Sequence, residues 1–252
     1  MIMKYKYADI HCDLDMCKEP DKVADRAEKA SVLIIAQGVN VGSNRKVLAL
    51  KEKHKNVLCA LGIYPIDALA MTDKEIDDEI EFIRKNSAKV SAIGEVGIDY
   101  KEDKDNWERQ ERIFRKFVKL AGELNVPIII HSRKAELKVI EILEALGARK
   151  VIMHCFCGKK KLEERIIKSG WYLTVPTTVT RTEQFQERAK SCPLNLLFCE
   201  TDSPYLHPDK SGDQNEPTLV VRAYKEIAKL RKIGEKEVIE QMKENFDRLF
   251  TS

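Results

Sequence analysis

The sequence has no long apolar run and no export signal. The longest stretch without a charged side chain in its 252 residues lies between Lys29 and Arg45, and it is interrupted by Gln37 and Asn40. That stretch is shorter than the ~18 apolar residues that a membrane-spanning helix requires. The N-terminal segment has no apolar core followed by a small-residue cleavage site. We therefore expect no membrane association and a cytoplasmic location.

Neither sign of charge dominates the sequence. Lys and Arg total 44, and Asp and Glu total 41, so the formal net charge is +3 with the two signs interleaved. A protein that binds nucleic acid mainly by charge shows a concentrated basic stripe, which this sequence lacks. Any contact with a polyanion must therefore be local. Apolar residues make up 43% of the chain, which excludes intrinsic disorder as its main state.

Cysteine occurs in no pattern typical of a disulfide framework or a zinc site. The chain has seven cysteines, an odd number, and no pair with CxxC spacing, since Cys155 and Cys157 are only two positions apart. A chain of this size does not need disulfides to stabilise its core. We interpret the cysteines as free thiols that pack as small apolar side chains, with metal binding by thiols as the alternative.

Linkers, internal repeats and low-complexity tracts are also absent, so residues 1–252 are predicted to form a single domain. Short β-branched apolar runs alternate with charged segments of helical period, which is typical of an α/β protein with a parallel sheet. Eight runs are predicted to be strands, namely Tyr7–His11, Ser31–Ala36, Val57–Gly62, Val90–Glu95, Pro127–His131, Val151–His154, Tyr172–Val175 and Leu196–Glu200. Eight strand–helix units in about 250 residues indicate a TIM-type (β/α)8 barrel.

Two of the intervening segments carry clear helix signals. Residues 72–75 read Thr-Asp-Lys-Glu, a capping box, and Ile76, Ile80 and Ile83 follow at helical spacing. A second helix begins near Trp107, and its apolar stripe is predicted to pack the indole ring on the sheet together with two phenylalanines.

The stripe of that second helix includes Phe114 and Phe117.

Gly147 and Gly170 each follow a periodic run and precede a predicted strand. This is the position where a residue with left-handed backbone ends a helix, so both glycines are predicted to do so.

Histidines and carboxylates gather at the predicted strand ends. These residues are His11, Asp13, Glu95, His131, His154 and Asp202. In a barrel the carboxyl ends of all strands share one rim, so the six side chains are predicted to converge there. Buried carboxylates without a counter-charge are unfavourable, and divalent cations would neutralise them. The sequence therefore predicts a metal site.

A single histidine after an apolar run is often only a core residue, so the prediction depends on three of the five falling at strand ends. The other two, His54 in a charged segment and His207 in a Pro-bounded loop, are interpreted as solvent-exposed.

Short motifs extend this pattern over nearly the whole chain. They are DIHCD, GIYP, GEVGIDY, QERIF, PIIIHSR, HCFCG, ETDSPYL and NEP. In this order and spacing they resemble the TatD family of metal-dependent deoxyribonucleases, within the amidohydrolase-like TIM barrels. The resemblance implies two divalent cations bound by the six residues above, with Glu95 bridging them.

The family commonly has histidines where this chain has Asp13 and Tyr64. A carboxylate in place of an imidazole makes the site harder and more anionic, which favours Mg²⁺ or Mn²⁺ over Zn²⁺, although Asp also ligates zinc. Asp15 lies two residues beyond Asp13 and competes for the same role, and we favour Asp13. Loss of the histidine at Tyr64 is expected to weaken substrate contact without abolishing hydrolysis.

Two cations suit phosphodiester cleavage, because they clamp the attacking and leaving oxygens and make hydroxide available at neutral pH. Asp202 is assigned as general base and Glu95 as the second catalytic carboxylate. Arg133 is a candidate phosphate ligand through its guanidinium fork, with a surface ion pair as the alternative. Lys159, the first of three consecutive lysines, is a candidate to steer a nucleic-acid backbone, with a solvated helix start as the alternative.

These features predict a metal-dependent deoxyribonuclease. By resemblance it is a 3'-5' exonuclease on single-stranded DNA in repair or turnover, and a monomer is favoured. One alternative is a metal-dependent amidohydrolase or lactonase acting on a small molecule, because the same ligands activate water there. Such enzymes commonly carry a carbamylated lysine where this chain has Glu95. Another alternative is a non-catalytic barrel, against which six intact ligands count.

Overall fold

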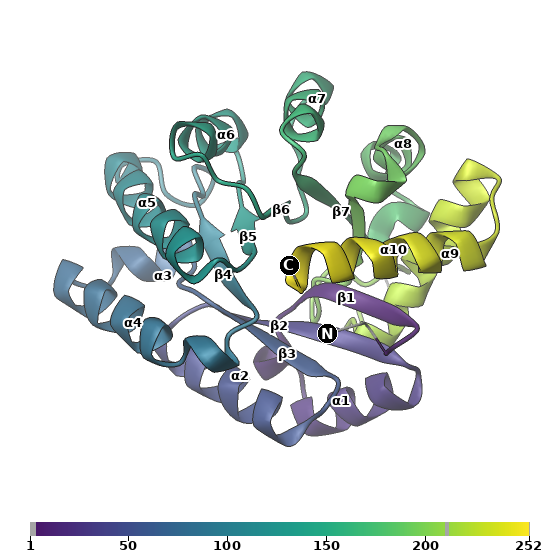
Figure 1. Cartoon of the computed structure of the whole chain (residues 1–252), viewed down its shortest axis with the longest axis horizontal. Helices are drawn as coiled ribbons and strands as arrows, with labels where there is room; N and C mark the ends of the chain where they lie inside the picture. The colour runs from purple at the N-terminus through teal and green to yellow at the C-terminus, as the bar shows by residue number, and fades with distance from the viewer. Residues whose placement is uncertain (1–3, 210–211, 252) are drawn as a thin grey trace. The chain divides into compact units, whose positions relative to one another are not determined.

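A computed structural model describes residues 4–209 and 212–251 of the chain. Strands and helices alternate along it, as the colours from purple to yellow show in Figure 1. The strands are β1 (Tyr7–Cys12), β2 (Val32–Gly38), β3 (Val57–Leu61), β4 (Ala92–Gly97), β5 (Ile128–His131), β6 (Val151–Met153), β7 (Tyr172–Pro176) and β8 (Leu197–Glu200). Each lies within two residues of its predicted bounds.

The α-helices of the described residues are α1 (Pro20–Lys29), α2 (Val41–Lys53), α3 (Pro65–Leu69), α4 (Asp73–Lys85), α5 (Trp107–Leu124), α6 (Glu136–Ala145), α7 (Lys160–Lys168), α8 (Glu183–Ser191), α9 (Val220–Arg231) and α10 (Glu235–Phe250). Short 3-10 helices also occur, namely η1 (Leu14–Met16), η2 (Ser87–Lys89), η3 (Thr177–Thr180), η4 (Leu194–Leu196) and η5 (Pro217–Leu219). In the described residues, no helix combines the length and hydropathy needed to cross a membrane.

The strands form one eight-stranded sheet in the order β1 to β8. Their pairing is parallel, for example Tyr7 with Val32 and Ile128 with Val151. A parallel bridge between Cys12 and Ser203 links the end of β1 to the segment after β8. Chain-order parallel pairing with alternating helices is the topology of a TIM-type (β/α)8 barrel, so the predicted fold class is confirmed.

The chain divides into two compact units. The first comprises the described residues up to 36, residues 49–58 and the described residues from 172 onward. In it, β1 is buried along its whole length and packs with α9 and α10. Tyr224 of α9 fixes this packing, because its hydroxyl accepts a hydrogen bond from Ala8 N–H and donates one to Ala8 O.

The second unit comprises residues 37–48 and 59–171. Its core lies between the fully buried strand β4 and α5, and α3 and α4 pack against α5. The predicted capping box of α4 is confirmed. The Glu75 N–H donates to Thr72 Oγ1 at 3.2 Å, and the Thr72 N–H donates to Glu75 Oε2 at 2.6 Å.

The prediction for α5 is partly wrong. Phe114 and Phe117 are buried as expected, but Trp107 is 43% exposed. Trp107 is the first residue of the helix. Side chains of a helix point back toward its N-terminus, so this indole reaches the preceding loop rather than the sheet. It stacks on Tyr100 with ring centroids 4.4 Å apart.

Of the other local predictions, those for two glycines are confirmed and the one for His54 is wrong. Gly147 and Gly170 have φ of 64° and 71°, so both end helices with the left-handed backbone that was expected. His54 is not solvent-exposed, since only 8% of it is accessible and its Nε2 lies 2.7 Å from Asp21 Oδ1. That prediction was wrong because a distant helix supplies its partner. His207 is partly exposed.

The cysteines form no disulfide among the described residues. Five of them are buried, as expected of small apolar side chains, namely Cys12, Cys17, Cys59, Cys192 and Cys199.

Candidate metal centre

In the second unit, the ends of three strands bring together a carboxylate and two imidazoles. Glu95 lies in β4, His131 ends β5, and His154 follows β6 directly. Each offers one ligand atom, and these atoms all lie within 4.8 Å of one another. Glu95 Oε1 is 2.9 Å from His131 Nδ1 and 3.8 Å from His154 Nε2. The sequence predicted all three as ligands, and the fold places them together.

The second ring nitrogen of His131 contacts a carboxylate that the sequence analysis did not select. His131 Nε2 lies 2.9 Å from Asp99 Oδ2, and Asp99 is fully buried. Burial acts to lower the pKa of His131, but the hydrogen bonds to Asp99 and Glu95 outweigh burial and raise that pKa to about 9. A carboxylate on one ring nitrogen fixes the orientation of the imidazole and leaves the other nitrogen to a metal.

Asp99 is itself held rigidly. Its Oδ1 accepts hydrogen bonds from the backbone N–H groups of Lys101 and Glu102, at 2.7 and 2.9 Å. Gln110 of α5 clamps its backbone, because the Gln110 amide accepts from Asp99 N–H and donates to Asp99 O. Burial would raise the pKa of Asp99, yet the hydrogen bonds from His131 and the two N–H groups lower it to about 2. The carboxylate is therefore charged when it contacts His131.

Tyr64 stands where the TatD resemblance suggests a histidine, and it joins the same cluster. Its hydroxyl donates to Asp99 Oδ2 at 3.1 Å, and its ring meets that of His131 edge to face with centroids 5.0 Å apart. Burial raises the pKa of the Tyr64 phenol, and the charges of Asp99 and Glu95 raise it further. The hydroxyl thus stays protonated as a donor to Asp99.

A glycine allows β4 and β5 to approach closely at this point. Gly97 ends β4 with φ of 154°, and it pairs with His131. A Cβ atom there would lie 1.9 Å from the His131 carbonyl oxygen. Only glycine fits, so the GEVG segment positions Glu95 beside His131.

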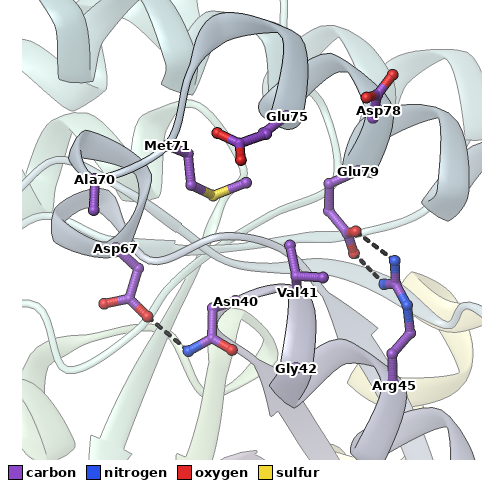
Figure 2. Close-up of a pocket in the computed structure, with 10 residues that line it drawn as sticks. All are labelled: Asn40, Val41, Gly42, Arg45, Asp67, Ala70, Met71, Glu75, Asp78 and Glu79. Carbon is purple, nitrogen blue, oxygen red and sulfur yellow. Dashed lines mark hydrogen bonds and ion pairs between the residues drawn. The ribbon is translucent and has the colours of Figure 1, made fainter.

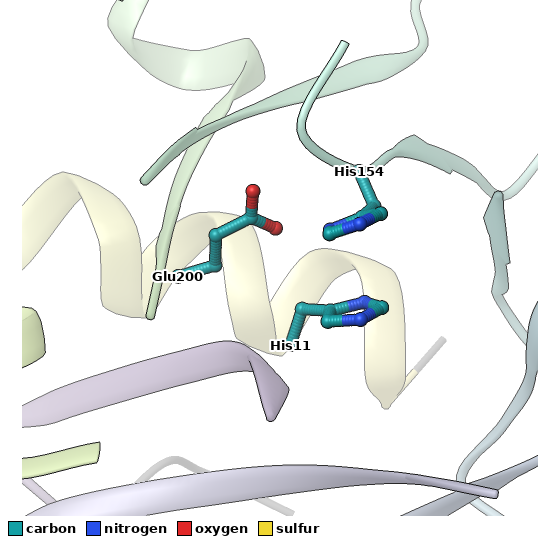
Figure 3. Close-up of side chains that lie close together, drawn as sticks. All are labelled: His11, His154 and Glu200. Atoms are coloured by element: carbon teal, nitrogen blue, oxygen red, sulfur yellow. The ribbon is translucent and has the colours of Figure 1, made fainter. Parts of the chain in front are cut away.

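The first unit carries a second group of candidate ligands at the ends of β1 and β8. His11 of β1 is fully buried, and its Nε2 lies 3.5 Å from Asp202 Oδ1. Candidate ligand atoms of Asp13 and of Glu200 each lie within 4.8 Å of that of His11. Figure 3 shows the Glu200 carboxylate and the His11 imidazole, and it also draws His154.

Local backbone geometry sets the positions in this group. Asp202 has φ of 59°, a left-handed conformation, and its N–H donates to His11 O at 2.9 Å. Buried Asp9 accepts from the backbone N–H groups of His11 and Thr201, at 3.3 and 2.8 Å, and from the Thr201 hydroxyl. Asp9 therefore ties the His11 backbone to the end of β8.

Asp13 and Asp15 differ in position. Asp13 is only 5% exposed and its carboxylate is near His11, whereas Asp15 lies in η1 and is half-buried. No candidate ligand group among the described residues includes Asp15. The geometry favours Asp13.

The donor chemistry of both groups fits divalent cations. Each group combines imidazole nitrogen, a ligand typical of Zn²⁺ and other transition metals, with carboxylate oxygens, which also suit Mg²⁺ and Mn²⁺. Several buried carboxylates would repel one another without a positive charge between them. These residues are therefore suited to hold metal.

The two predicted substrate-binding residues lie outside these groups. Arg133, two residues beyond His131, is half exposed, and its guanidinium is 3.3 Å from Glu102 Oε1. Lys159 is exposed at the N-cap of α7.

Sequence reasoning missed Asp99, Glu200 and Asp9. Asp99 was available in GEVGIDY, four residues beyond Glu95, and Glu200 ends a predicted strand. Asp9 is a fully buried residue of β1 within an apolar run, and only its hydrogen bonds with Thr201 show what it does.

The second unit also contains a cavity of about 590 Å³ that is lined by none of the candidate metal ligands. It is lined by Asn40, Val41, Gly42, Arg45, Asp67, Ala70, Met71, Glu75, Asp78 and Glu79. Its one guanidinium, on Arg45, is paired with Glu79 at 2.5 and 2.7 Å, and the Asn40 amide donates to Asp67 (Figure 2). With four carboxylates and a neutralised arginine, this cavity does not suit a phosphate.

Comparison with known proteins decides the family. The family model described as TatD related DNase matches residues 8–251. The chain belongs to the TatD family. It is 37% identical over 248 residues to an uncharacterized metal-dependent hydrolase of Methanocaldococcus jannaschii, covering 97% of each chain. It is 32% identical over 257 residues to human deoxyribonuclease TATDN3, covering 96% of this chain and 93% of the relative.

A solved TatD structure agrees with the fold. The TatD homologue YJJV of Escherichia coli K12 superposes with a TM-score of 0.91, at 28% identity, with all of both chains covered. The TatD relatives are metal-dependent hydrolases, and this chain is an enzyme of that class. The resemblance inferred from the motifs is thus confirmed.

Proposed function

We propose that this TatD-family hydrolase is a deoxyribonuclease that cleaves phosphodiester bonds of DNA. The group of Glu95, His131 and His154, whose candidate ligand atoms lie within 4.8 Å of one another, carries the proposal. Membership of a family described as TatD related DNase, and the name of the human relative, support DNA as the substrate.

We propose further that both ligand groups belong to one centre holding two divalent cations. In a (β/α)8 barrel the carboxyl ends of all strands share one rim, which supports joining them. The residues that would hold the cations are His11, Asp13, Glu95, His131, His154 and Asp202, and by resemblance Glu95 would be shared between the two. The Asp13 carboxylate favours Mg²⁺ or Mn²⁺, and Zn²⁺ remains compatible with the same donors.

When bound, the cations neutralise charge on the phosphodiester and lower the pKa of water toward about 7. Asp202 then accepts a proton from the attacking water at a carboxylate oxygen. It suits this role because its side chain is 17% exposed and thus reaches solvent, while His11 beside it is fully buried. Asp99 keeps the His131 ring fixed throughout, because it holds Nε2 and leaves Nδ1 facing Glu95.

Arg133 and Lys159 are proposed to hold the DNA backbone. Arg133 follows His131 by two residues, and its exposed guanidinium can exchange Glu102 for a phosphate oxygen. Lys159 is exposed five residues beyond His154 and supplies a mobile positive charge. Both contacts weaken with salt.

By resemblance, we propose 3'-5' exonuclease action on single-stranded DNA, as a cytoplasmic monomer that serves DNA repair or turnover. A single domain over residues 1–252 is part of this proposal. A strand labelled at its 5' end tests the direction, because 3'-5' digestion produces a descending ladder of labelled products.

The decisive experiment compares the parent with Glu95→Gln on 5'-labelled single-stranded DNA with Mg²⁺ or Mn²⁺. Loss of the bridging carboxylate should reduce cleavage by at least about 100-fold, more than the loss of an outer-shell partner. Glu81→Gln is the matched control, since Glu81 lies on the exposed side of α4 and pairs only with Arg84 and Lys85 among the contacts described. Equal cleavage by parent and Glu95→Gln, or none by either, rejects the proposal. Glu95-dependent hydrolysis of a small amide or lactone instead would favour an amidohydrolase.

A further inference from the structure

Trp107 is an exposed aromatic side chain held in one orientation. It is 43% exposed, yet its ring stacks on Tyr100 at 4.4 Å with an interplanar angle of 26°. Its indole N–H donates to the Asp103 carbonyl at 3.0 Å. The indole is thus already fixed, and its only polar group is satisfied within the protein. What it offers to solvent is apolar aromatic surface.

The aromatic pair is anchored to the segments that carry the metal ligands. Tyr100 directly follows Asp99, which contacts His131. The Tyr100 N–H donates to Arg133 O at 3.0 Å, and its hydroxyl donates to Glu111 at 2.7 Å. The stacked rings therefore belong to the loop after β4 and are tied to the segment after β5.

The loop of residues 101–106 between Tyr100 and Trp107 has no excess of positive charge that would attract a nucleic acid. Residues 101–106 contain two lysines and three acidic side chains. The Asp103 carboxylate accepts from the N–H groups of Asp105 and Asn106, and Glu102 pairs with Arg133. The charges of this segment nearly cancel, so the exposed face of Trp107 is what it adds to the backbone contacts proposed for Arg133 and Lys159.

We propose that Trp107 is a stacking platform for an unpaired nucleobase of the DNA strand that is cleaved at the metal centre. This inference rests on the proposed nuclease function and specifies its substrate. Bases inside a duplex have both faces covered by their neighbours, whereas an unpaired base presents a free face to an aromatic ring. Stacking on aromatic side chains is a general means of holding single strands without sequence preference. A fixed indole loses little freedom on binding, so the stack is pre-organised.

Intrinsic fluorescence tests the contact directly. The chain has two tryptophans, and Trp171 is buried, so Trp171→Phe leaves Trp107 as the only tryptophan, which is excited at wavelengths that tyrosine does not absorb. The probe is oligothymidylate with hydrolysis-resistant phosphorothioate linkages, in Mg²⁺. A strand of equal length and linkage but without bases is its control. We expect saturable quenching by the thymidylate strand and none by the abasic strand.

Binding of fluorescein-labelled strands to the full chain with both tryptophans gives a second measurement. Trp107→Ala should bind the thymidylate strand roughly 5- to 100-fold more weakly than the parent, in line with loss of one stacked base. It should bind the abasic strand unchanged, and Trp107→Phe should restore most of the affinity. Leu137→Ala removes another exposed apolar side chain, which is 48% exposed on α6, and should change neither affinity.

The outcomes separate this inference from the nuclease proposal. If the parent cleaves DNA but Trp107→Ala binds and cleaves single strands as the parent does, the platform is wrong and the nuclease stands. Equal quenching by both strands, or equal weakening for both, also overturns the platform. If the parent neither binds nor cleaves DNA, the nuclease proposal fails and the platform fails with it.

Discussion

At the scale of single residues, the site depends on which ring nitrogen of a histidine is available. His131 has a carboxylate at each nitrogen, Glu95 at Nδ1 and Asp99 at Nε2. Asp99 keeps a proton on Nε2, so Nδ1 is the nitrogen that can lose its proton and bind metal. The role of Asp99 is to position His131, and Tyr64 supports it from the other side with a hydrogen bond.

Asp99→Asn tests this assignment. The Asn oxygen can still accept from Lys101 and Glu102, but its amide then donates toward His131 Nε2. That contact forces the ring proton onto Nδ1, the nitrogen facing Glu95. Metal affinity should fall about 10- to 100-fold, as measured by Mn²⁺ titration calorimetry.

Tyr64→Phe is the control for that measurement. It removes one hydrogen bond to Asp99 and leaves the tautomer of His131 unchanged, so its effect should be much smaller. If Asp99→Asn binds Mn²⁺ as tightly as the parent does, Asp99 has no influence on the metal ligand.

At the scale of secondary structure, a helix signal in the sequence is reliable when the residues that interact lie within the same few positions. It is less reliable when a side chain can also contact residues outside the helix. The capping box of α4 is complete within residues 72–75, so it forms wherever the helix forms. Trp107 of α5 is an example of the second kind. Its spacing from the other apolar residues of α5 predicted that it would face the sheet. Because it is the first residue of the helix, its side chain instead contacts Tyr100 in the preceding loop.

Thr72→Ala should lower the free energy of unfolding by about 1 kcal/mol, because it leaves the Glu75 N–H without its side-chain acceptor. Thr182→Ala provides a matched comparison. Thr182 is the N-cap of α8, but its side chain makes no capping hydrogen bond. Urea unfolding should show a clearly smaller effect at Thr182. Equal losses at the two positions would mean that the capping box contributes no stability.

At the scale of the whole molecule, the proposal of one metal centre predicts that candidate ligands from the two units respond to metal together. A metal that binds only the folded state of a protein stabilises that state, by about 2.7 kcal/mol when the free metal is 100 times its dissociation constant. His11 belongs to the first unit and His154 to the second. If both bind in one centre, either His11→Ala or His154→Ala should remove most of the Mn²⁺-dependent rise in melting temperature.

The double variant His11→Ala/His154→Ala distinguishes one shared metal centre from two independent sites. For one shared centre it should lose no more metal-dependent stabilisation than either single variant, because coupled ligands are not additive. Elemental analysis should show reduced bound metal in each. Two independent sites would instead give additive losses, and unchanged metal content in His154→Ala would remove it from the ligand set.

Sequence alone determined much of this protein. The eight strands were predictable because short β-branched runs bounded by charged helical segments are a local signal. The grouping of Glu95, His131 and His154 was predictable because each lies at a strand end, where a parallel barrel gathers side chains. The TatD family followed from motifs in that order, and the family comparison confirmed it.

Tertiary structure decided the contacts between distant positions. Asp99 and His131 are 32 residues apart, and His54 and Asp21 are 33 apart. Neither pairing has a local pattern, because a polar residue in a loop or helix can face solvent or a buried partner with equal local propensity. Which of these occurs depends on what the fold brings near, and so does the stack of Trp107 on Tyr100.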